Sequence, residues 1–294
     1  MPKPLLDLPR LDGKRAIVTG ANSGLGFETT RALSALGAEV LLAVRNVEAG
    51  NAAADRIRAV NPDARLTVAH LDLADLSSIR AFSSAQATTS VDILVNNAGI
   101  MAPPFSRSLD GIESQMATNH IGHFALTAGL FPALVADHGG RVVSLSSMAH
   151  RRGKFLTADV DEVRGVEAGY SAWSRYGTTK LACLMFALEL DRRVKASGLP
   201  IVSVAAHPGW ASTNLQKDGN ERANFLAQSA ATGARSQILA AASNGFTGGE
   251  FIGPRLEVWG TPRLGRGIAP AYDETLADNL WASSEELSGT TFAL

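Results

Sequence analysis

The chain has 294 residues and a formal net charge of −1, and its composition is 46% hydrophobic and 19% charged. It is long enough to bury a full core, and these values argue against nucleic-acid binding through bulk positive charge. A single cysteine, Cys183, excludes an internal disulfide and a thiolate metal cluster. No segment has the apolar run of a signal peptide or the ~18 apolar residues of a membrane span. The sequence therefore predicts a cytoplasmic protein without a membrane span.

Short apolar runs alternate with stretches of helical spacing from residue 15 onward. This alternation is typical of parallel strands that are covered by helices on both faces. Strands are predicted at residues 15–19, 39–44, 66–69, 91–95, 141–145 and 201–205, with a seventh of weaker pattern near 249–252. Helices are predicted at about residues 25–36, 47–59, 76–88, 111–137, 174–197 and 221–243. Gly37, Gly139 and Gly198 follow three of these helices, where a glycine can end a helix.

No repeat, linker or shift of composition divides the chain, so residues 1–294 are predicted to form a single domain. The predicted fold is α/β, a doubly wound parallel sheet of Rossmann type with about seven strands and helices on both faces. Residues 151–175 are mainly polar and are predicted to form an excursion on the substrate side, as a wall or lid or as a solvated loop. Residues 253–294, rich in Gly, Pro and Trp, are predicted to form a C-terminal cap.

The first predicted strand leads directly into a glycine-rich turn, Thr19-Gly20-Ala21-Asn22-Ser23-Gly24-Leu25-Gly26, and then into a helix. Glycines let the backbone approach a phosphate group closely, and the N–H groups at the start of the helix would bind it. The spacing differs from the G-x-G-x-x-G dinucleotide fingerprint, and the alternative is a simple connecting turn. In its strand and helix context, the turn favours a dinucleotide-binding domain.

Tyr176 and Lys180 lie four residues apart in a predicted helix and therefore share one face. A neighbouring ammonium group favours the anionic form of a phenol, so the pair is a candidate acid and base. Taken alone, this spacing also fits the solvated face of an amphipathic helix.

Four motifs, in this order along the chain, resemble the short-chain dehydrogenase/reductase family in its single-domain form. They are T-G-x-x-x-G-x-G at residues 19–26, Asn96-Asn97-Ala98-Gly99, Ser146-Ser147 and Y-x-x-x-K at residues 176–180. Residues 141–150, 176–182 and 207–209 are further similar to the branch of the retinol dehydrogenases and light-dependent protochlorophyllide reductases. Thr179 and Cys183 depart from the Ser and Asn that are usual in close relatives. The resemblance runs from about residue 13 to Thr213, and more loosely to the end.

The resemblance implies a catalytic group of Asn119, Ser147, Tyr176 and Lys180. Tyr176 would exchange a proton with the reacting oxygen, Ser147 would orient that oxygen, and Lys180 would assist Tyr176 electrostatically and hold the nicotinamide ribose. Asn119 would position a water behind Lys180, although its residue type alone also fits polar helix surface. Chemistry does not separate Ser147 from its neighbour Ser146, because adjacent strand residues point to opposite faces, and the family pattern favours Ser147.

The preferred cofactor is predicted from the end of the second strand, where a carboxylate would bind the ribose hydroxyls of NAD. Val44 stands there, followed by Arg45, whose guanidinium suits the 2′-phosphate of NADP; a plain surface charge is the alternative. We therefore expect NADP(H) in preference to NAD(H). The resemblance also implies contacts of Asp72 and Leu73 with the adenine. The full predicted cofactor set is Gly20, Asn22, Ser23, Gly24, Leu25, Gly26, Arg45, Asp72, Leu73, Asn96, Ala98, Gly99, Tyr176, Lys180, Pro208, Gly209 and Thr213.

Together these features predict an NADP(H)-dependent oxidoreductase that interconverts a hydrophobic alcohol and its ketone or aldehyde. Met148, Phe155 and Trp210 are the candidate substrate-pocket residues, and the histidines lack a spacing suited to a metal site. Two alternatives are a carbon–carbon double-bond reductase of the same family and a non-catalytic sensor of nicotinamide nucleotides. The resemblance places a homodimer or homotetramer surface on the helices at 111–137 and 174–197, and a monomer stays open.

Overall fold

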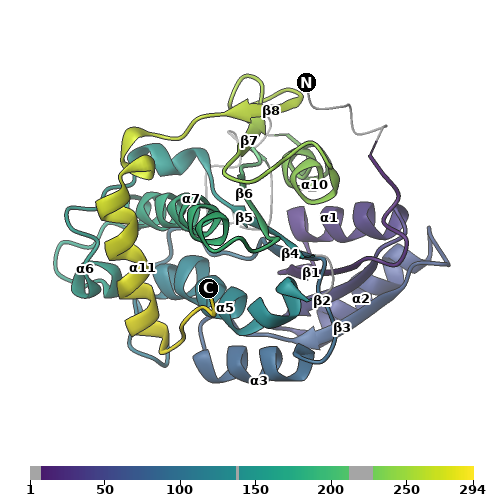
Figure 1. The fold of residues 1–294 in the computed structure, drawn as a ribbon, viewed down its shortest axis with the longest axis horizontal. Helices are drawn as coiled ribbons and strands as arrows, with labels where there is room; N and C mark the ends of the chain where they lie inside the picture. Colours follow the sequence, from purple (N-terminus) through teal and green to yellow (C-terminus); the bar gives the residue numbers. More distant parts are fainter. Residues whose placement is uncertain (1–7, 137–138, 212–227) are drawn as a thin grey trace.

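An eight-stranded sheet forms the centre of the structure, a computed structural model that describes residues 8–136, 139–211 and 228–294 (Figure 1). Its strand order is β3-β2-β1-β4-β5-β6-β7-β8, and all neighbours are parallel except β8, which pairs antiparallel with β7 at the edge. The order reverses between β1 and β4, which creates a crevice beyond their carboxyl ends. The strands are β1 (Arg15–Thr19), β2 (Glu39–Val44), β3 (Leu66–His70), β4 (Ile93–Asn96), β5 (Arg141–Leu145), β6 (Val202–Ala206), β7 (Phe251–Pro254) and β8 (Pro262–Gly265).

Helices cover both faces of the sheet, with α1, α2 and α10 on one face and α3, α5 and α7 on the other (Figure 1). A π-helical turn, Ala117–Ile121, joins α4 directly to α5. Such turns are uncommon and occur often at functional sites. The helices are α1 (Gly24–Ala35), α2 (Val47–Arg58), α3 (Leu76–Gln86), α4 (Ser114–Met116), α5 (Gly122–Val135), α6 (Val160–Arg164), α7 (Ala172–Ala196), α9 (Ala230–Gly233), α10 (Arg235–Ala242) and α11 (Glu274–Ser288).

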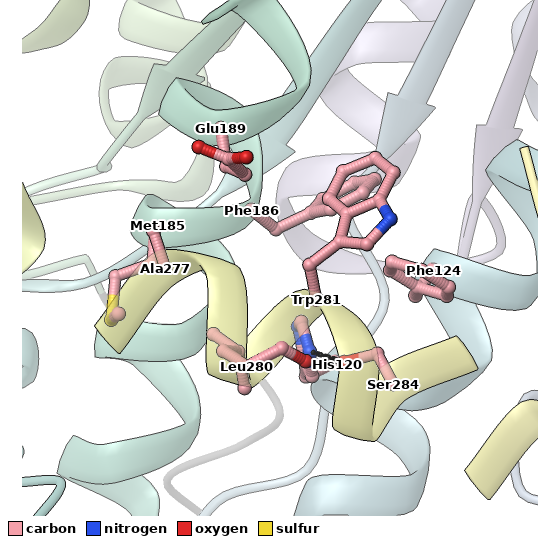
Figure 2. A pocket seen from close by; sticks show the side chains of 9 residues that line it. All are labelled: His120, Phe124, Met185, Phe186, Glu189, Ala277, Leu280, Trp281 and Ser284. Atoms are coloured by element: carbon pink, nitrogen blue, oxygen red, sulfur yellow. Dashed lines mark hydrogen bonds between the residues drawn. The ribbon is translucent and has the colours of Figure 1, made fainter. Parts of the chain in front are cut away.

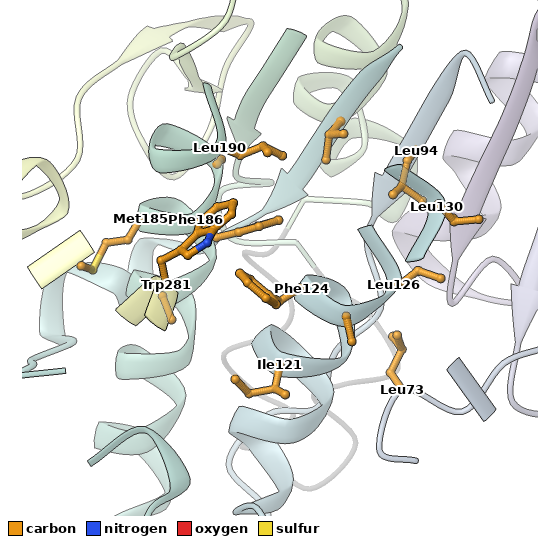
Figure 3. Close-up of a cluster of buried hydrophobic side chains, with 14 of the residues drawn as sticks. Leu73, Leu94, Ile121, Phe124, Leu126, Leu130, Met185, Phe186, Leu190 and Trp281 are labelled. Atoms are coloured by element: carbon orange, nitrogen blue, oxygen red, sulfur yellow. The ribbon is translucent and has the colours of Figure 1, made fainter. Parts of the chain in front are cut away.

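Adjacent strand residues alternate between two hydrophobic cores, because successive side chains point to opposite faces of a sheet. In β1, Ile17 belongs to the core beneath α3, α5 and α7, while Ala16 and Val18 belong to the core beneath α1, α2 and α10. All three are fully buried. Figure 3 shows part of the first core, which contains Phe124 and Trp281. Burial on both faces explains why the central strands are nearly continuous apolar runs.

Polar side chains fix where several helices begin. Asn46, Asp75 and Asp273 precede α2, α3 and α11, and each accepts hydrogen bonds from backbone N–H groups in the first turn. These caps satisfy donors that have no intrahelical partner. At the other end, Gly37 and Gly198 follow α1 and α7 with positive φ angles of 101° and 68°. The helix bounds are thus set by local chemistry that the sequence carries.

The predicted α/β fold with a mainly parallel sheet is confirmed, and its seven predicted strands lie within about two residues of their expected bounds. Several features differ, among them α6 and α11, which lie in the stretches 151–175 and 253–294 where no helix was predicted. The helix predicted at 111–137 is divided by the π-helical turn, and β8 was not predicted because its sequence, Pro-Arg-Leu-Gly, shows no apolar alternation. Part of the helix predicted at 221–243 lies outside the described residues, and the rest forms α9 and α10.

The C-terminal segment contributes a long helix, α11, which lies across α5 and α7 (Figure 1). Trp281 packs its ring 5.1 Å from that of Phe124 and 6.0 Å from that of Phe186, and His120 shares a 2.8 Å hydrogen bond with Ser284. Figure 2 shows these side chains around a cavity of about 10 Å³, near the lower limit for holding one water. In the described residues no helix is long and apolar enough to cross a bilayer.

Three histidines are held neutral inside this fold. Burial lowers the pKa of His120 to about 3, and that of His123 and His207 to about 4. In the unfolded chain a histidine titrates near pH 6.5, so the unfolded state binds more protons than the native state between about pH 6.5 and pH 4. Stability is therefore complete above about pH 6.5 and falls as the pH drops through this window.

We predict that the free energy of unfolding decreases by roughly 1 kcal/mol for each of these three histidines between about pH 7.5 and about pH 5.5. Urea unfolding at the two pH values measures the difference. His120→Gln should make the pH dependence shallower by about one such increment, whereas His70→Asn, which changes an exposed histidine of β3, should leave it unchanged. Equal pH dependence in all three proteins would contradict the assignment.

Candidate active site

A cleft of about 1270 Å³ opens at the carboxyl ends of the central strands. Its lining comes from the glycine turn, the loops that follow β4, β5, β6 and β7, and the first turns of α7. This is the crevice expected where strand order reverses in a doubly wound sheet. The lining includes Leu25, Asn97, Gly99, Ser146, Ser147, Tyr176, Lys180, Pro208 and Gly209.

Tyr176 and Lys180 lie on one face of α7, at the cleft. Both are largely buried, with 7% and 6% of their surface exposed, and the Lys180 Nζ lies 5.9 Å from the centroid of the Tyr176 ring. Lys180 Nζ donates a 3.0 Å hydrogen bond to the carbonyl of Leu145. An ammonium group has three donors, so two are left for oxygens that enter the cleft. The solvated-face interpretation of this pair does not fit its burial.

The structure separates the two serines that follow β5. Ser146 is buried, and its hydroxyl donates a 2.7 Å hydrogen bond to the carbonyl of Lys180. Ser147 is only half-buried, and its Oγ accepts a 3.2 Å hydrogen bond from the N–H of Ala149. The Ser147 hydroxyl keeps its proton available to a group in the cleft, whereas Ser146 serves to hold α7.

Asn119 lies in the π-helical turn, and its side chain is fully engaged. Its Oδ1 accepts from the N–H of Ile100 at 2.8 Å, and its Nδ2 donates to the Ile100 carbonyl and to Thr179 Oγ1, both at 3.0 Å. A side-chain carbon placed on Gly99 would be 3.0 Å from Asn119 Oδ1 and 3.5 Å from Lys180 Nζ. Asn119 Oδ1 and Lys180 Nζ therefore both lie close to Gly99. Asn119 is not polar helix surface.

His123 connects the π-helical turn to Thr19, the last residue of β1, where the glycine turn begins. Its Nδ1 lies 3.0 Å from the Asn119 carbonyl, which can only accept, so a neutral His123 carries its proton on Nδ1. Its Nε2 then accepts from the hydroxyl of Thr19 at 2.9 Å. The Thr19 Oγ1 in turn accepts from the N–H groups of Asn97 and Ala98, both at 2.9 Å. One chain of hydrogen bonds thus joins β1, the loop after β4 and the π-helical turn.

The glycine turn is shaped to receive a phosphate group. Gly20 and Gly24 have positive φ angles of 63° and 54°. Ser23 precedes α1 without capping it through its side chain, so the first N–H groups of the helix remain available to an anion. A side-chain carbon on Gly26 would lie 2.6 Å from Asn97 Nδ2, so only glycine allows this close packing. The donor set of the turn fits a dinucleotide pyrophosphate.

The residues predicted to bind the adenosine half of the cofactor differ in their exposure. Arg45 follows β2, is exposed, and has no carboxylate within 4 Å among the described residues. Asp72 is half-buried and accepts from the N–H of Ala74. Leu73 is buried in the core, so only its backbone can face a ligand. Thr213 lies outside the described residues.

Asn96 was predicted to bind the cofactor, but its neighbour Asn97 is the asparagine that lies at the cleft. Asn96 does not line the cleft: it is buried, and its Nδ2 donates to Thr127 Oγ1 of α5 at 3.0 Å. Asn97 lines the cleft instead, with its Nδ2 donating to the Thr19 carbonyl at 2.7 Å. Alternation at the end of β4 turns the two amides to opposite sides.

The substrate side also differs in part from the prediction. Met148 and Trp210 line the cleft, but Phe155 is buried in the core and does not. Further residues complete the wall that sequence reasoning did not single out. These are Ile100, Met101, Ala102, Pro103, Pro104, Ala149, Arg151, Arg152, Lys154, Trp173, Ser174, Ala211, Glu257 and Val258. The Pro-rich loop after β4 could have been found from its place at a strand's carboxyl end.

A buried ion pair anchors the excursion at 151–175 beside the cleft. The fully buried carboxylate of Glu113 accepts from Arg175 Nε at 2.9 Å and from the Tyr170 hydroxyl at 3.2 Å. It also accepts from the N–H groups of Gln115 and Met116. A buried charge requires such complete pairing. This ion pair ties the excursion to the body of the protein, and Arg151, Arg152, Lys154, Trp173 and Ser174 from it line the cleft.

The sequence is similar to those of known proteins. A family model described as short chain dehydrogenase matches residues 14–158. Retinol dehydrogenase 12 from Homo sapiens is 34% identical over 290 residues, which cover 95% of this chain and 88% of that protein. Retinol dehydrogenase 11 from Mus musculus is 42% identical over 210 residues, covering 71% and 65%. The chloroplastic short-chain dehydrogenase TIC 32 B from Brassica napus is 36% identical over 289 residues, covering 92% and 88%.

Solved structures show the same fold. The crystal structure of an uncharacterized protein from Mycobacterium paratuberculosis is 39% identical and superposes with a TM-score of 0.86, covering 100% of both chains. A short chain dehydrogenase/reductase family protein is 26% identical with a TM-score of 0.66, covering 82% of this chain and 95% of that one.

We predict that Gly26→Ala destabilises the protein by about 1–3 kcal/mol, because its methyl group would overlap the Gly20 carbonyl and Asn97 Nδ2. This should lower the thermal midpoint by several degrees in a differential scanning measurement. Gly265→Ala is the matched control, since a carbon there meets only ordinary contacts of 3.7 Å or more. A Gly26→Ala protein as stable as the control would refute the packing argument.

Proposed function

Because the chain belongs to the short-chain dehydrogenase/reductase family, in the branch of the retinol dehydrogenases, we propose that it is an NADP(H)-dependent oxidoreductase that interconverts a hydrophobic alcohol and its ketone or aldehyde. The observation that carries the proposal is the convergence of Tyr176, Lys180 and Ser147 on one cleft beside the glycine turn. A proton donor, a fixed cation and a hydroxyl are the groups that a carbonyl oxygen needs when charge develops on it.

Each residue has a task that its position supports. Tyr176 donates a proton to the carbonyl oxygen in reduction and removes it in alcohol oxidation. Ser147 hydrogen-bonds the same oxygen and fixes its direction. Lys180, held by the Leu145 carbonyl, places its positive charge beside the phenol and offers its two remaining donors to ribose hydroxyls. When bound, the nicotinamide supplies or accepts the hydride.

Asn119 and the glycine turn support these groups. Asn119 Oδ1 and Lys180 Nζ both lie close to Gly99, and we propose that one water held there passes a proton toward the solvent. The pyrophosphate would bind the free N–H groups of α1, and Arg45 would bind the 2′-phosphate of NADP at the end of β2. Pro208 and Gly209 also line the cleft, and we propose that they contact the nicotinamide.

The two alternatives gain no support from the site. A sensor has no need of Tyr176 and Lys180 in a shared cleft, and no residue of the described cleft favours a carbon–carbon double bond over a carbonyl group. The apolar lining from Met148, Trp210 and the loop after β4 suits a hydrophobic substrate.

We predict that Tyr176→Phe lowers kcat by about a hundredfold or more, because it removes the proton donor, while the Kd for NADPH changes little. Steady-state turnover of aldehydes and fluorescence titration with NADPH measure the two effects. Tyr272→Phe removes a hydroxyl from the C-terminal segment and serves as the control. Unchanged turnover in Tyr176→Phe would overturn the mechanism.

We predict that Arg45→Glu raises the KM for NADPH by about tenfold to a hundredfold and leaves that for NADH unchanged or lower. A carboxylate repels the 2′-phosphate and accepts hydrogen bonds from the free ribose hydroxyls. Initial rates measured over a range of NADPH and NADH concentrations give the two KM values. Arg80→Glu, an equal charge change at an exposed position of α3, should have no such effect. If both variants behave alike, Arg45 does not select the cofactor.

A further inference from the structure

The substrate end of the cleft carries a concentration of positive charge that the reaction itself does not require. Arg151, Arg152 and Lys154 line it, and Glu257 is the only carboxylate in the described lining. The neighbouring lining is apolar and includes Met101, Pro103, Trp173 and Trp210. A purely apolar alcohol or aldehyde would contact the apolar lining and leave the three cations without a function.

Glu257 neutralises only one of these cations. Arg151 Nη2 lies 2.5 Å from Glu257 Oε1, and this ion pair joins the segment after β5 to the turn between β7 and β8 across the mouth of the cleft. Glu257 has a φ of 62°, in the left-handed region that a non-glycine residue enters at some cost, and its N–H donates to the Pro254 carbonyl. The turn thus directs its carboxylate to Arg151.

Among the described residues, Arg152 and Lys154 have no ion-pair partner comparable to Glu257. Neither has a carboxylate within 4 Å in the described parts of the chain. Both side chains are exposed on the cleft side, so their charges are available to a ligand.

The backbone that presents these two cations is fixed beside Tyr176. A side-chain carbon on Gly153 would lie 2.5 Å from the Gly177 carbonyl, so the two backbones are in direct contact. The N–H and carbonyl of Lys154 both hydrogen-bond the hydroxyl of Thr178, at 3.4 and 3.3 Å. The cations are therefore presented from a rigid wall next to the proposed acid.

These charges are separate from the predicted phosphate contacts of the cofactor. Arg45 follows β2, whereas Arg152 and Lys154 follow β5, and β1 and β4 lie between those strands. Three strand spacings amount to about 14 Å. A dinucleotide whose phosphates bind at α1 and Arg45 would leave Arg152 and Lys154 free.

We propose that the preferred substrate is an amphipathic anion: an alcohol or carbonyl compound with an apolar carbon skeleton and a carboxylate or phosphate group. The apolar lining takes the skeleton, Arg152 and Lys154 bind the anionic group, and the reacting carbon lies at Tyr176. This inference rests on the proposed oxidoreductase function and specifies its substrate class. A guanidinium binds either anion with paired hydrogen bonds, and the lysine adds a point charge.

The test compares an ω-oxo fatty acid with its methyl ester of the same chain length as substrates for NADPH-dependent reduction. We expect kcat/KM to favour the acid by about tenfold, equivalent to about 1.4 kcal/mol, and the preference to shrink as ionic strength rises. An ω-oxoalkyl phosphate of similar length distinguishes the two anions: a larger preference assigns the site to phosphate, a smaller one to carboxylate. A ratio of one or less for both anions overturns the proposal.

The variant Arg152→Glu/Lys154→Glu should remove or reverse the preference, measured within each protein as the ratio of kcat/KM for acid and ester, and mainly through KM for the anions. Arg80→Glu/Arg58→Glu makes the same charge change away from the cleft and should preserve the preference. Equal preference in the two double variants would contradict a role for Arg152 and Lys154.

A binding measurement separates this proposal from the proposed function. Quenching of the fluorescence of Trp173 and Trp210 by the ω-hydroxy fatty acid and by its methyl ester reports affinity without turnover. Tighter binding of the acid, lost in Arg152→Glu/Lys154→Glu, would support the anion site even if no aldehyde were reduced. If both ω-oxo compounds were reduced while the ω-hydroxy acid and its ester bound with equal affinity, the proposed oxidoreductase function would stand and the anion site would be refuted.

Discussion

Two hydrogen bonds between α7 and the end of β5 hold the whole site in place. Ser146 donates to the Lys180 carbonyl, and Lys180 donates from its Nζ to the Leu145 carbonyl. They set the register of the helix against the strand, and Tyr176 and Ser147 reach the cleft only in that register. Because Lys180 is largely buried with one acceptor in the described structure, its remaining donors favour a bound oxygen by about 1–3 kcal/mol. The same contacts that stabilise the fold therefore prepare it for a ligand.

A second set of contacts couples the cofactor side to this helix. Thr19 receives the N–H groups of the loop after β4 and donates to His123, which donates to the Asn119 carbonyl, and the thiol of Cys183 donates to that carbonyl as well. The π-helical turn makes this possible because its wider backbone lets Asn119 use its side chain on Ile100 and its carbonyl on α5 and α7. The glycine turn is thus linked by hydrogen bonds to Asn119, whose Oδ1 lies close to Gly99, as does Lys180 Nζ.

The sequence predicted the sheet well because strands that are buried on both faces must be apolar throughout. The four-residue spacing of Tyr176 and Lys180 indicated a shared helix face, and the glycines after the first strand indicated a tight turn, as the structure has them. It named Asn96 as the cofactor-binding asparagine, whereas Asn97 lines the cleft, because the side that each amide faces depends on where β4 ends. Phe155 was assigned to the pocket and lies in the core, because an apolar residue in a polar excursion suits either place. The sequence did not place Arg152 and Lys154 at the cleft, because their position there depends on the packing of Gly153 against Gly177 of α7.

The C-terminal helix gives the strongest constraint on association. The helices that the family resemblance assigned to a dimer or tetramer surface are α5 and α7, and α11 lies on both of them. Trp281 and Phe292 stack among Phe124, Phe131 and Phe186, and Asp278 pairs with Arg192 and Arg193. Removing these rings would expose several hundred Å² of apolar surface, at about 25 cal/mol per Å², so a partner would have to replace contacts that the chain already makes with itself. Association through the faces of α5 and α7 that α11 covers would therefore require α11 to leave, which the depth of its packing opposes.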